Sequence, residues 1–592
     1  MKTRPIKNLQ VITAHSSLLF KPCLSIFIAS LTLSAQAATK RLSSTAPAGA
    51  NWNVASNWNP ASVPSSGDDL IFDYANQATP TTSSVLLSPL GTIQMANSIT
   101  FGSSLGAPLG AFTLKSAASD RTLDIASGNI TVDSSVTGTQ TIGITDPGGP
   151  VSLTTSNTGG YNLTNNSAVQ NFYLSVIFAS DTGLTLNSAG GSITIDLYPT
   201  HSTTLRYLEG GGTATISKST GSDTTLILNG SGSHIFDGAM NKGGSNPGID
   251  LVISGDATFV QKLTGSGNFT AGITITSGTL SVGFIGNSGV SGNLGANSAL
   301  ATWNGASAGT LQYTGATDST NRTFVINSNA TANIDITQAG AIFTVSGAGS
   351  GGGVLNKTGA GTLELSAGSS FSGGTTVSAG KLRLINSTGS ALGTGTVLVS
   401  GGPITTLSGT GTASGATTVN NSSRLAPGVN TSGTNGNFGV AGTLSLATGS
   451  AQGLTLSKAN LDFDLTNTAV TVGNGVNDLI LTSGVLTLNS SDVFTFNELN
   501  GALLTGQAYT LISGATSSNN TNPVTLAAIA ANTQFIGTTY AATFSLATGT
   551  NNLQVTFANA PEPDSLVLML SGAAALLGRR RRKQHVHTAK VG

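Results

Sequence analysis

The stretch GVLNKTGAGTLELSAGSSFSGGTTVSAGKLRL, Gly353 to Leu384, decides the fold of this chain. It contains two segments in which a glycine precedes alternating apolar residues, starting at Gly361 and at Gly380. Alternation with a period of two sends the apolar pair to one face of a β-strand and the intervening polar residues to the other. Glycine permits the positive φ of a tight corner. The stretch therefore predicts two short strands, each entered through a corner.

The unit Gly-x-apolar-x-apolar recurs along the chain. Its other copies begin at Gly128, Gly191, Gly278, Gly395, Gly442 and Gly484. A strand this short cannot bury its apolar face alone, but it can when it stacks on a neighbouring coil, as in a solenoid. The intervals of 19 residues from Gly361 to Gly380 and 15 from Gly380 to Gly395 predict coils of two or three such strands. Since the body has no helical periodicity of useful length, we expect an all-β, right-handed parallel β-helix or β-solenoid.

The composition agrees with a folded exported body. Of 592 residues, 8% are charged and 77 are glycine, yet apolar residues are frequent enough to form a core. Residues 38–560 hold 14 basic and 22 acidic side chains, a net charge of −8. Nucleic acid is not an expected partner, because it would require a basic patch.

The first 37 residues have the pattern of a signal peptide. Basic residues precede an apolar run from Cys23 to Leu33, and Ala35-Gln36-Ala37 supplies the small-x-small pattern that signal peptidase recognises. We expect cleavage after Ala37, so that the mature chain begins at Ala38. Cys23 is the sole cysteine, and a mature chain without it has no disulfide.

The other end has the pattern of a short membrane segment. Pro561, Glu562 and Pro563 precede an uncharged stretch, 565–578, which is followed by Arg579, Arg580, Arg581, Arg582 and Lys583. A helix over this stretch would be roughly 21 Å long, short of the ~30 Å hydrocarbon core. The basic cluster favours the cytoplasmic face. We therefore expect a short C-terminal transmembrane helix that leaves the body outside the inner membrane.

This order of tail elements resembles the PEP-CTERM sorting signal of Gram-negative bacteria. The resemblance implies that an exosortase removes the tail and passes the protein to the cell surface or extracellular matrix. Pro561, Glu562, Pro563 and Arg579 to Arg582 would then form the sorting signal, and the protein would be anchored in the inner membrane only transiently. An ordinary tail anchor is the alternative.

Residues 353–384 also resemble the autotransporter-associated β-strand repeat of passenger domains. The positions that match its pattern are Lys357, Gly359, Gly361, Leu363, Leu365, Gly374, Thr375, Val377, Gly380, Leu382 and Leu384. A second, shortened copy keeps Gly272, Ile275, Gly278, Leu280 and Val282. The resemblance implies a passenger-like β-helix.

A separate motif opens the body. Trp52 and Trp58 precede Pro64 and the Gly67-Asp68-Asp69 turn, as in many surface proteins of these kinds. We favour a solenoid cap, in which bulky aromatics block edge-to-edge pairing. The alternative is a sugar-stacking platform. Asp68 and Asp69 leave open a calcium site or a carboxylate pair for glycoside cleavage.

Catalytic and metal constellations are not evident in the sequence. His201 and His234 lie outside any metal-binding spacing, so we expect loop or coil residues. Asp462 and Asp464 alternate with apolar residues, which predicts a half-buried strand with its acids in solvent, and Asp478 has the same pattern. We predict no catalytic residue, cofactor or metal.

The predicted organisation has six parts. They are the signal peptide (1–37), a cap with the first coils (45–115), irregular coils (116–345), the repeat region (346–450), a C-terminal β region that is either a cap or a small sandwich (451–559) and the sorting tail (560–592). We expect a structural or adhesive surface protein, processed by signal peptidase and exosortase, with exopolysaccharide as its ligand. A β-helical polysaccharide lyase or hydrolase is the main alternative, and a passenger that delivers an effector is a third.

Overall fold

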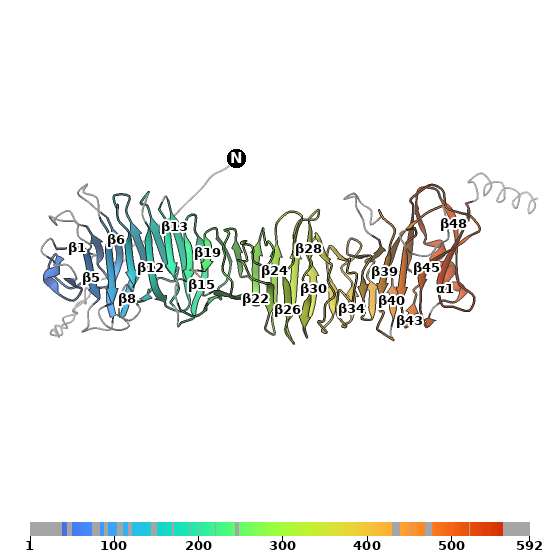
Figure 1. Cartoon of the computed structure of the whole chain (residues 1–592), viewed down its shortest axis with the longest axis horizontal. Coiled ribbons are helices and arrows are strands. Elements are labelled where there is room, and N and C mark those ends of the chain that lie inside the picture. The colour runs from blue at the N-terminus through green and yellow to red at the C-terminus, as the bar shows by residue number, and fades with distance from the viewer. Residues whose placement is uncertain are drawn as a thin grey trace, which may run out of the picture.

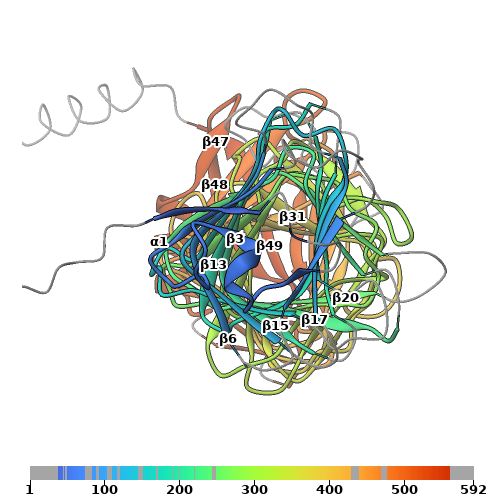
Figure 2. The same ribbon diagram turned by 90° about the vertical axis from the view of Figure 1, so that its left-hand side faces the viewer.

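The computed structural model describes residues 38–560 except 44–45, 47–49, 74–82, 88–92, 103–109, 117–120, 144–150, 169–170, 190, 199–200, 219–220, 243–247, 429–438, 452, 468–475 and 520. These residues form an elongated stack of coils (Figure 1), and the view along its axis shows the strands of successive coils superimposed around one cross-section (Figure 2). Ala35, Ala37 and the tail residues of the sorting prediction lie outside the described residues.

One parallel ladder runs almost the whole length of the stack, and we call it the long face. Its strands are β1 (Thr39–Leu42), β4 (Asp69–Phe72), β6 (Ile93–Phe101), β8 (Arg121–Val132), β11 (Tyr161–Asn165), β13 (Thr182–Ser188), β15 (Thr203–Gly210), β18 (Ser233–Phe236), β21 (Val260–Leu263), β22 (Gly272–Val282), β24 (Ala308–Tyr313), β27 (Thr331–Ile336), β30 (Val354–Thr358), β32 (Thr375–Val377), β34 (Val397–Val399), β37 (Thr417–Asn420), β40 (Leu454–Ser457), β43 (Val485–Thr487) and β46 (Ser517–Asn519).

The strand that follows the long face in each coil belongs to a second ladder, which has two parts. The first contains β2 (Ala50–Asn51), β5 (Ser83–Leu87), β7 (Phe112–Ser116), β9 (Gln140–Gly143), β12 (Phe172–Phe178), β14 (Ile193–Asp196), β16 (Thr215–Lys218) and β19 (Ala239–Lys242). The second contains β25 (Asp318–Thr320), β28 (Ile342–Val345), β31 (Thr362–Leu365), β33 (Lys381–Leu384), β35 (Thr406–Gly409), β38 (Arg424–Pro427), β41 (Asn460–Leu465), β44 (Val493–Glu498) and β47 (Gln534–Ile536).

A third ladder completes the cross-section. It uses parts of β6, β8, β12, β15 and β22 together with β10 (Val151–Thr154), β17 (Thr224–Leu228), β20 (Ile249–Ser254), β23 (Ala299–Trp303), β26 (Thr323–Ile326) and β29 (Gly349–Gly351). Near the C-terminal end a mixed sheet contains β36 (Thr412–Ala413), β39 (Thr443–Leu446), β42 (Leu479–Thr482), β45 (Ala508–Ser513), β48 (Tyr540–Leu546) and β49 (Leu553–Asn559). The prediction of a stack of parallel strands is confirmed, and the described residues are nearly all β.

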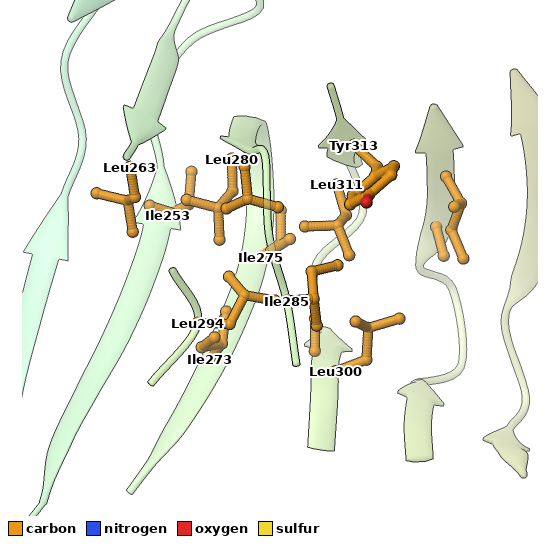
Figure 3. Close-up of a cluster of buried hydrophobic side chains, with 14 of the residues drawn as sticks. Ile253, Leu263, Ile273, Ile275, Leu280, Ile285, Leu294, Leu300, Leu311 and Tyr313 are labelled. Atoms are coloured by element: carbon orange, nitrogen blue, oxygen red, sulfur yellow. The ribbon is translucent and has the colours of Figure 1, made fainter. Parts of the chain in front are cut away.

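The core is a column of apolar side chains from successive coils. Leu363, Leu382, Leu407, Leu425 and Leu461 follow one another in register on the second ladder, and all are fully buried. Figure 3 shows another section of the core, where Leu280 of β22 and Leu311 of β24 point inward from adjacent strands. The inward direction predicted for the Gly-x-apolar-x-apolar pairs is therefore confirmed.

The two sequence intervals have different meanings. Leu363 stacks directly on Leu382, so 19 residues complete one coil. The units at Gly380 and Gly395 belong instead to β33 and β34, which lie on different faces, so the 15-residue interval is a step around a coil and not a repeat of it. Gly380 adopts the positive φ of a corner, at 62°, whereas Gly361 is required because a Cβ there would lie 2.4 Å from the Gln338 carbonyl oxygen.

The ends of the stack differ from its middle. At the N-terminal end β3 (Trp58–Asn59), preceded by the 3-10 turn η1 (Ala55–Asn57), pairs antiparallel with β1. At the other end the parallel ladders continue as far as β47, after which β48 and β49 form an antiparallel hairpin. The region after 451 thus begins as further coils and ends in antiparallel strands.

The described residues depart from the all-β pattern at one short segment. The body contains a helix, α1 (Pro523–Ala531), for which Asn522 is the N-cap and accepts a hydrogen bond from the Thr525 amide at 3.0 Å. Its apolar residues are distributed all round, so it lacks the 3.6-residue periodicity by which a helix is found in a sequence. Within the described ranges, no helix has both the length and the apolar character needed to cross a bilayer.

Candidate functional site

The long face presents a row of uncharged polar side chains to solvent. Thr279, Thr310, Asn333, Asn356 and Thr376 occupy equivalent positions on β22, β24, β27, β30 and β32, and each is half-buried. They point outward because the apolar residues beside them point into the core. We call this row the polar ladder. Its members repeat at the ~4.8 Å spacing of neighbouring strands.

Hydrogen bonds between coils hold the polar ladder in order. Asn333 Nδ2 donates to Thr310 Oγ1 at 3.3 Å, and Asn356 Nδ2 donates to Asn333 Oδ1 at 2.9 Å. Ser378 Oγ continues the chain by donating to Asn356 Oδ1 at 2.7 Å. A carboxamide has two N–H groups and two acceptor lone pairs, so each asparagine keeps hydrogen-bonding capacity for a ligand. The ladder is thus an ordered array of donors and acceptors.

A buried lysine lies beneath this surface. Lys357 takes an inward position on β30, between Ile334 and Val377 of the neighbouring coils, and is fully buried. Its ammonium donates to the Gly359 carbonyl at 2.9 Å and the Ala379 carbonyl at 3.3 Å, and it also contacts the Thr358 carbonyl. Burial lowers the pKa of Lys357 to about 8. The lysine ties the corner after β30 to the next coil.

The tryptophans of the N-terminal motif are buried at the N-terminal end of the stack. Trp52 and Trp58 are almost completely buried, with ring centroids 5.3 Å apart, and both contact Phe72. Trp58 Nε1 donates to the Trp52 carbonyl at 2.8 Å. Because neither indole face reaches solvent, the alternative of a sugar-stacking platform at these residues is wrong.

The two adjacent aspartates have separate partners. Asp68 Oδ2 accepts from the amide and the hydroxyl of Ser65, both at 2.8 Å. Asp69 Oδ1 accepts from Asn97 Nδ2 at 2.8 Å and Ser98 Oγ at 2.6 Å, on the next coil. Asp68 fixes a local turn and Asp69 joins coils, so the structure gives each carboxylate a structural role. Ala38, the predicted first mature residue, accepts a hydrogen bond from the Asp69 amide at 3.0 Å.

The two histidines of the body lie in neighbouring coils and have separate surroundings. His234 is on β18, where its ring stacks on Tyr207 at a centroid distance of 3.9 Å and Nδ1 lies 3.3 Å from Glu209 Oε2. His201 lies in the turn before β15, beside the ring of Tyr198. Among the described residues, no three His, Cys, Asp or Glu side chains gather as they would around a metal ion.

The expectation that Asp462, Asp464 and Asp478 face solvent is wrong. Each is only 1% exposed. Asp462 and Asp464 do point away from the core, but other segments of the chain cover them. Asp464 Oδ2 accepts a hydrogen bond from the Gly439 amide at 2.7 Å. Asp478 accepts hydrogen bonds from the amides of Gly442 and Asp464, each at 2.7 Å. Arg424 pairs with both oxygens of Asp462 at 2.8 and 2.9 Å. Burial raises the pKa of Asp478 well above its ordinary value.

Comparisons with known proteins agree with the repeats. Residues 260–282 and 355–384 match the family described as the passenger-associated transport repeat. These two matches confirm that the chain carries passenger-type repeats at the two places predicted. The first match includes β21 and β22, and the second includes most of β30 and all of β31, β32 and β33, so the polar ladder crosses both.

Two further proteins are similar to this chain. The adhesin BmaC autotransporter of Brucella suis biovar 1 (strain 1330) is 32% identical over 262 residues, which are 41% of this chain and 7% of that protein. The chain therefore matches only a small part of that relative's length. The crystal structure of the Haemophilus influenzae Hap adhesin aligns with 83% of this chain and 63% of its own, at 11% identity and a TM-score of 0.26.

Proposed function

We propose that this protein is an exported β-solenoid that acts at the cell surface or in the extracellular matrix of a Gram-negative bacterium as a structural and adhesive element. The observation that carries the proposal is the polar ladder, which presents uncharged donors and acceptors at regular spacing along a coil stack with passenger-type repeats. The similarity of part of the chain to an autotransporter adhesin supports the same role.

The ligand we propose is a polysaccharide. Sugar hydroxyls both donate and accept hydrogen bonds, as do the side chains of Thr310, Asn333 and Asn356. Each such bond is weak, but a polymer can form many along one face, and binding of the first segment raises the effective concentration of the next. Affinity would then be spread over the ladder and not concentrated in a pocket.

The ends of the sequence supply the proposed route. Signal peptidase would cleave after Ala37, and the stretch 565–578 would hold the protein transiently in the inner membrane. An exosortase would then act at Pro561, Glu562 and Pro563, with Arg579 to Arg582 on the cytoplasmic side. This route rests on the resemblance of the tail to the PEP-CTERM signal.

Fractionation of the native host tests the proposal. An antibody against the body is used to compare the mass and location of the protein in the parent strain and in a strain without exosortase. We expect a shorter, surface-associated form in the parent and a longer, inner-membrane form in the other strain. The surface form is then sedimented with the host's extracellular polysaccharide. Equal mass and location in both strains would contradict the sorting route, and absence from the polysaccharide pellet would contradict the adhesive role.

A further inference from the structure

A loop replaces the second ladder where that ladder is interrupted. The first part of the ladder ends at β19 and the second begins at β25, and residues 283–297 lie in this break. Ile285 and Leu294 anchor the loop, because both are fully buried and lie among the apolar side chains of the core (Figure 3). Residues 287–291, between these anchors, are exposed.

A buried arginine holds the loop together. Arg322, two residues after β25, is fully buried, and its guanidinium donates to backbone carbonyls of the loop. The shortest of these bonds joins Nη2 to the Gly295 carbonyl at 2.7 Å. The other acceptors are the carbonyls of Ile285, Gly286, Asn287, Val290 and Leu294, at 3.1 to 3.4 Å. An arginine buried without a carboxylate partner is costly, and here six carbonyls share its charge.

Further hydrogen bonds fix both ends of the loop. Asn293 Oδ1 accepts from the amides of Gly283 and Phe284, at 3.1 and 2.8 Å. The next coil contributes Asn321, whose Oδ1 accepts from the Ser288 amide at 2.7 Å. Surface loops are normally the mobile parts of a fold. In this one, Arg322, Asn293 and Asn321 form hydrogen bonds with the backbone of residues 283–295.

The ordered loop presents an exposed aromatic ring. Phe284 is 47% exposed although its neighbour Ile285 is buried. The ring lies beside Gly286 and Gly292, where an added Cβ would come within 3.5 and 3.6 Å of ring carbons. Because both positions are glycine, neither supplies a side chain that would cover the ring.

We propose that Phe284 is a sugar-stacking platform for an uncharged pyranose residue of a polysaccharide, and that Arg322 is the positioning residue that holds it. This inference rests on the proposed function and deepens it. The C–H groups on one face of a pyranose ring fit the electron-rich face of an aromatic ring. A rigid aromatic side chain in a preorganised loop loses little entropy on binding, which is the usual character of a binding hot spot.

The charges around the platform favour a neutral sugar. The residues that follow Phe284 in the loop include Asn287, Ser288 and Ser291 but no charged side chain, and the cation of Arg322 is buried. Residues 38–560 carry a net charge of −8, which would repel an anionic polymer. Galactomannan is therefore the probe we expect to bind, and polygalacturonate the probe we expect to bind less.

Affinity electrophoresis of the exported protein, in gels containing either polymer, tests the inference. We expect Phe284→Ala to weaken retardation by galactomannan at least fivefold, and Phe284→Trp to restore it. Ile404→Ala is the matched control, since Ile404 is 73% exposed elsewhere on the stack, and it is expected to match the wild type. Arg322→Lys, which cannot span the same carbonyls, is expected to weaken retardation and to expose the loop to protease while the circular dichroism of the stack is kept.

The outcomes separate this inference from the proposed function. Equal retardation of wild type and Phe284→Ala by galactomannan would overturn the platform and leave the adhesive solenoid standing. Stronger, Phe284-dependent retardation by polygalacturonate would overturn the assignment to an uncharged sugar. Unchanged binding by Arg322→Lys would overturn the positioning role. A wild type that neither polymer retards would overturn the platform, and the adhesive role would fail as well if the host's own polysaccharide also left it unbound.

Discussion

Replacement of the buried Lys357 by methionine should change how stability depends on pH. The pKa of Lys357 falls from 10.5 to about 8 in the folded chain because burial disfavours the charged form. Between these values the unfolded chain holds the proton and the folded chain has lost it. The free energy of unfolding of the wild type should therefore rise with pH across this window and be independent of Lys357 below it.

The size of the effect follows from the shift. This lowering of the pKa changes the free energy of unfolding by about 3 kcal/mol between a pH well below both pKa values and a pH well above them. About 2 kcal/mol of this gain falls between pH 7 and pH 9.5. Lys357→Met removes this gain, so its stability should stay flat over the same range apart from terms that both proteins share. At pH 7 the variant avoids the cost of a buried charge but leaves the Gly359 and Ala379 carbonyls without a donor, which costs about 1–3 kcal/mol each. The pH slope is therefore the cleaner readout.

Urea denaturation at several pH values measures the slope. Trp52, Trp58 and Trp303 are all buried, so tryptophan fluorescence reports on unfolding of the N-terminal and central coils. The upper limit of pH 9.5 stays below the ionisation of the tyrosine side chains, which in the unfolded chain lose their protons near pH 10. The stability of the wild type minus that of Lys357→Met should rise by about 2 kcal/mol from pH 7 to 9.5. A difference that does not vary with pH would refute the placement of this ammonium in the core.

Three other predictions concern the core, the C-terminal coils and the tail. Leu382→Asp should destabilise the stack by ~3–5 kcal/mol in urea denaturation because it buries an unpaired charge. Lys381→Asp, at an outward position, should cost less than about 1 kcal/mol. Equal losses of stability would refute the assignment of Leu382 as inward and Lys381 as outward. Burial raises the pKa of Asp492 to about 6, so its contribution to stability should be lost as pH rises from about 4 through 6, and Asp492→Asn should abolish this dependence in thermal melting; an unchanged pH profile would contradict the burial argument. Alanines at 561–563 should leave export unaffected but trap uncleaved protein at the inner membrane, and appearance at the surface with the parent's mass and yield would exclude recognition of Pro-Glu-Pro.

The sequence was sufficient to predict the repeating part of the fold. Inward positions such as Leu363 and Leu382 follow from a two-residue alternation that needs no knowledge of distant chain. The outward polar positions follow from the same rule. What fills a given inward position is less predictable, because Lys357 stands in a row of aliphatic residues and is satisfied only by carbonyls that the coil geometry brings to it.

Features set by the path of the chain could not be predicted in this way. Asp464 alternates with apolar residues as an exposed acid would, yet it is buried because the segment that contains Gly439 crosses over it. Arg322 lies outside any repeat, and only the three-dimensional path of the loop brings carbonyls to its guanidinium. The helix α1 did leave a local signal, the Asn522-Pro523 start, which a search for N-caps could have found.

The most direct test of the account is the strength with which the exported protein binds the host's extracellular polysaccharide when the polar ladder is removed. The ladder variant carries alanine at Thr310, Asn333 and Asn356. The control carries alanine at three outward, half-buried residues of the third ladder, Thr274, Thr302 and Ser350.

At about 0.5–1.5 kcal/mol for each lost hydrogen bond, the ladder variant should bind at least about tenfold more weakly than the wild type. The affinity of the control should stay within about twofold of that of the wild type. Its substitutions lie outside the polar ladder, and surface substitutions of this kind change stability little. Equal affinities for all three proteins, or equal losses in both variants, would contradict the claim that the long face is the adhesive surface.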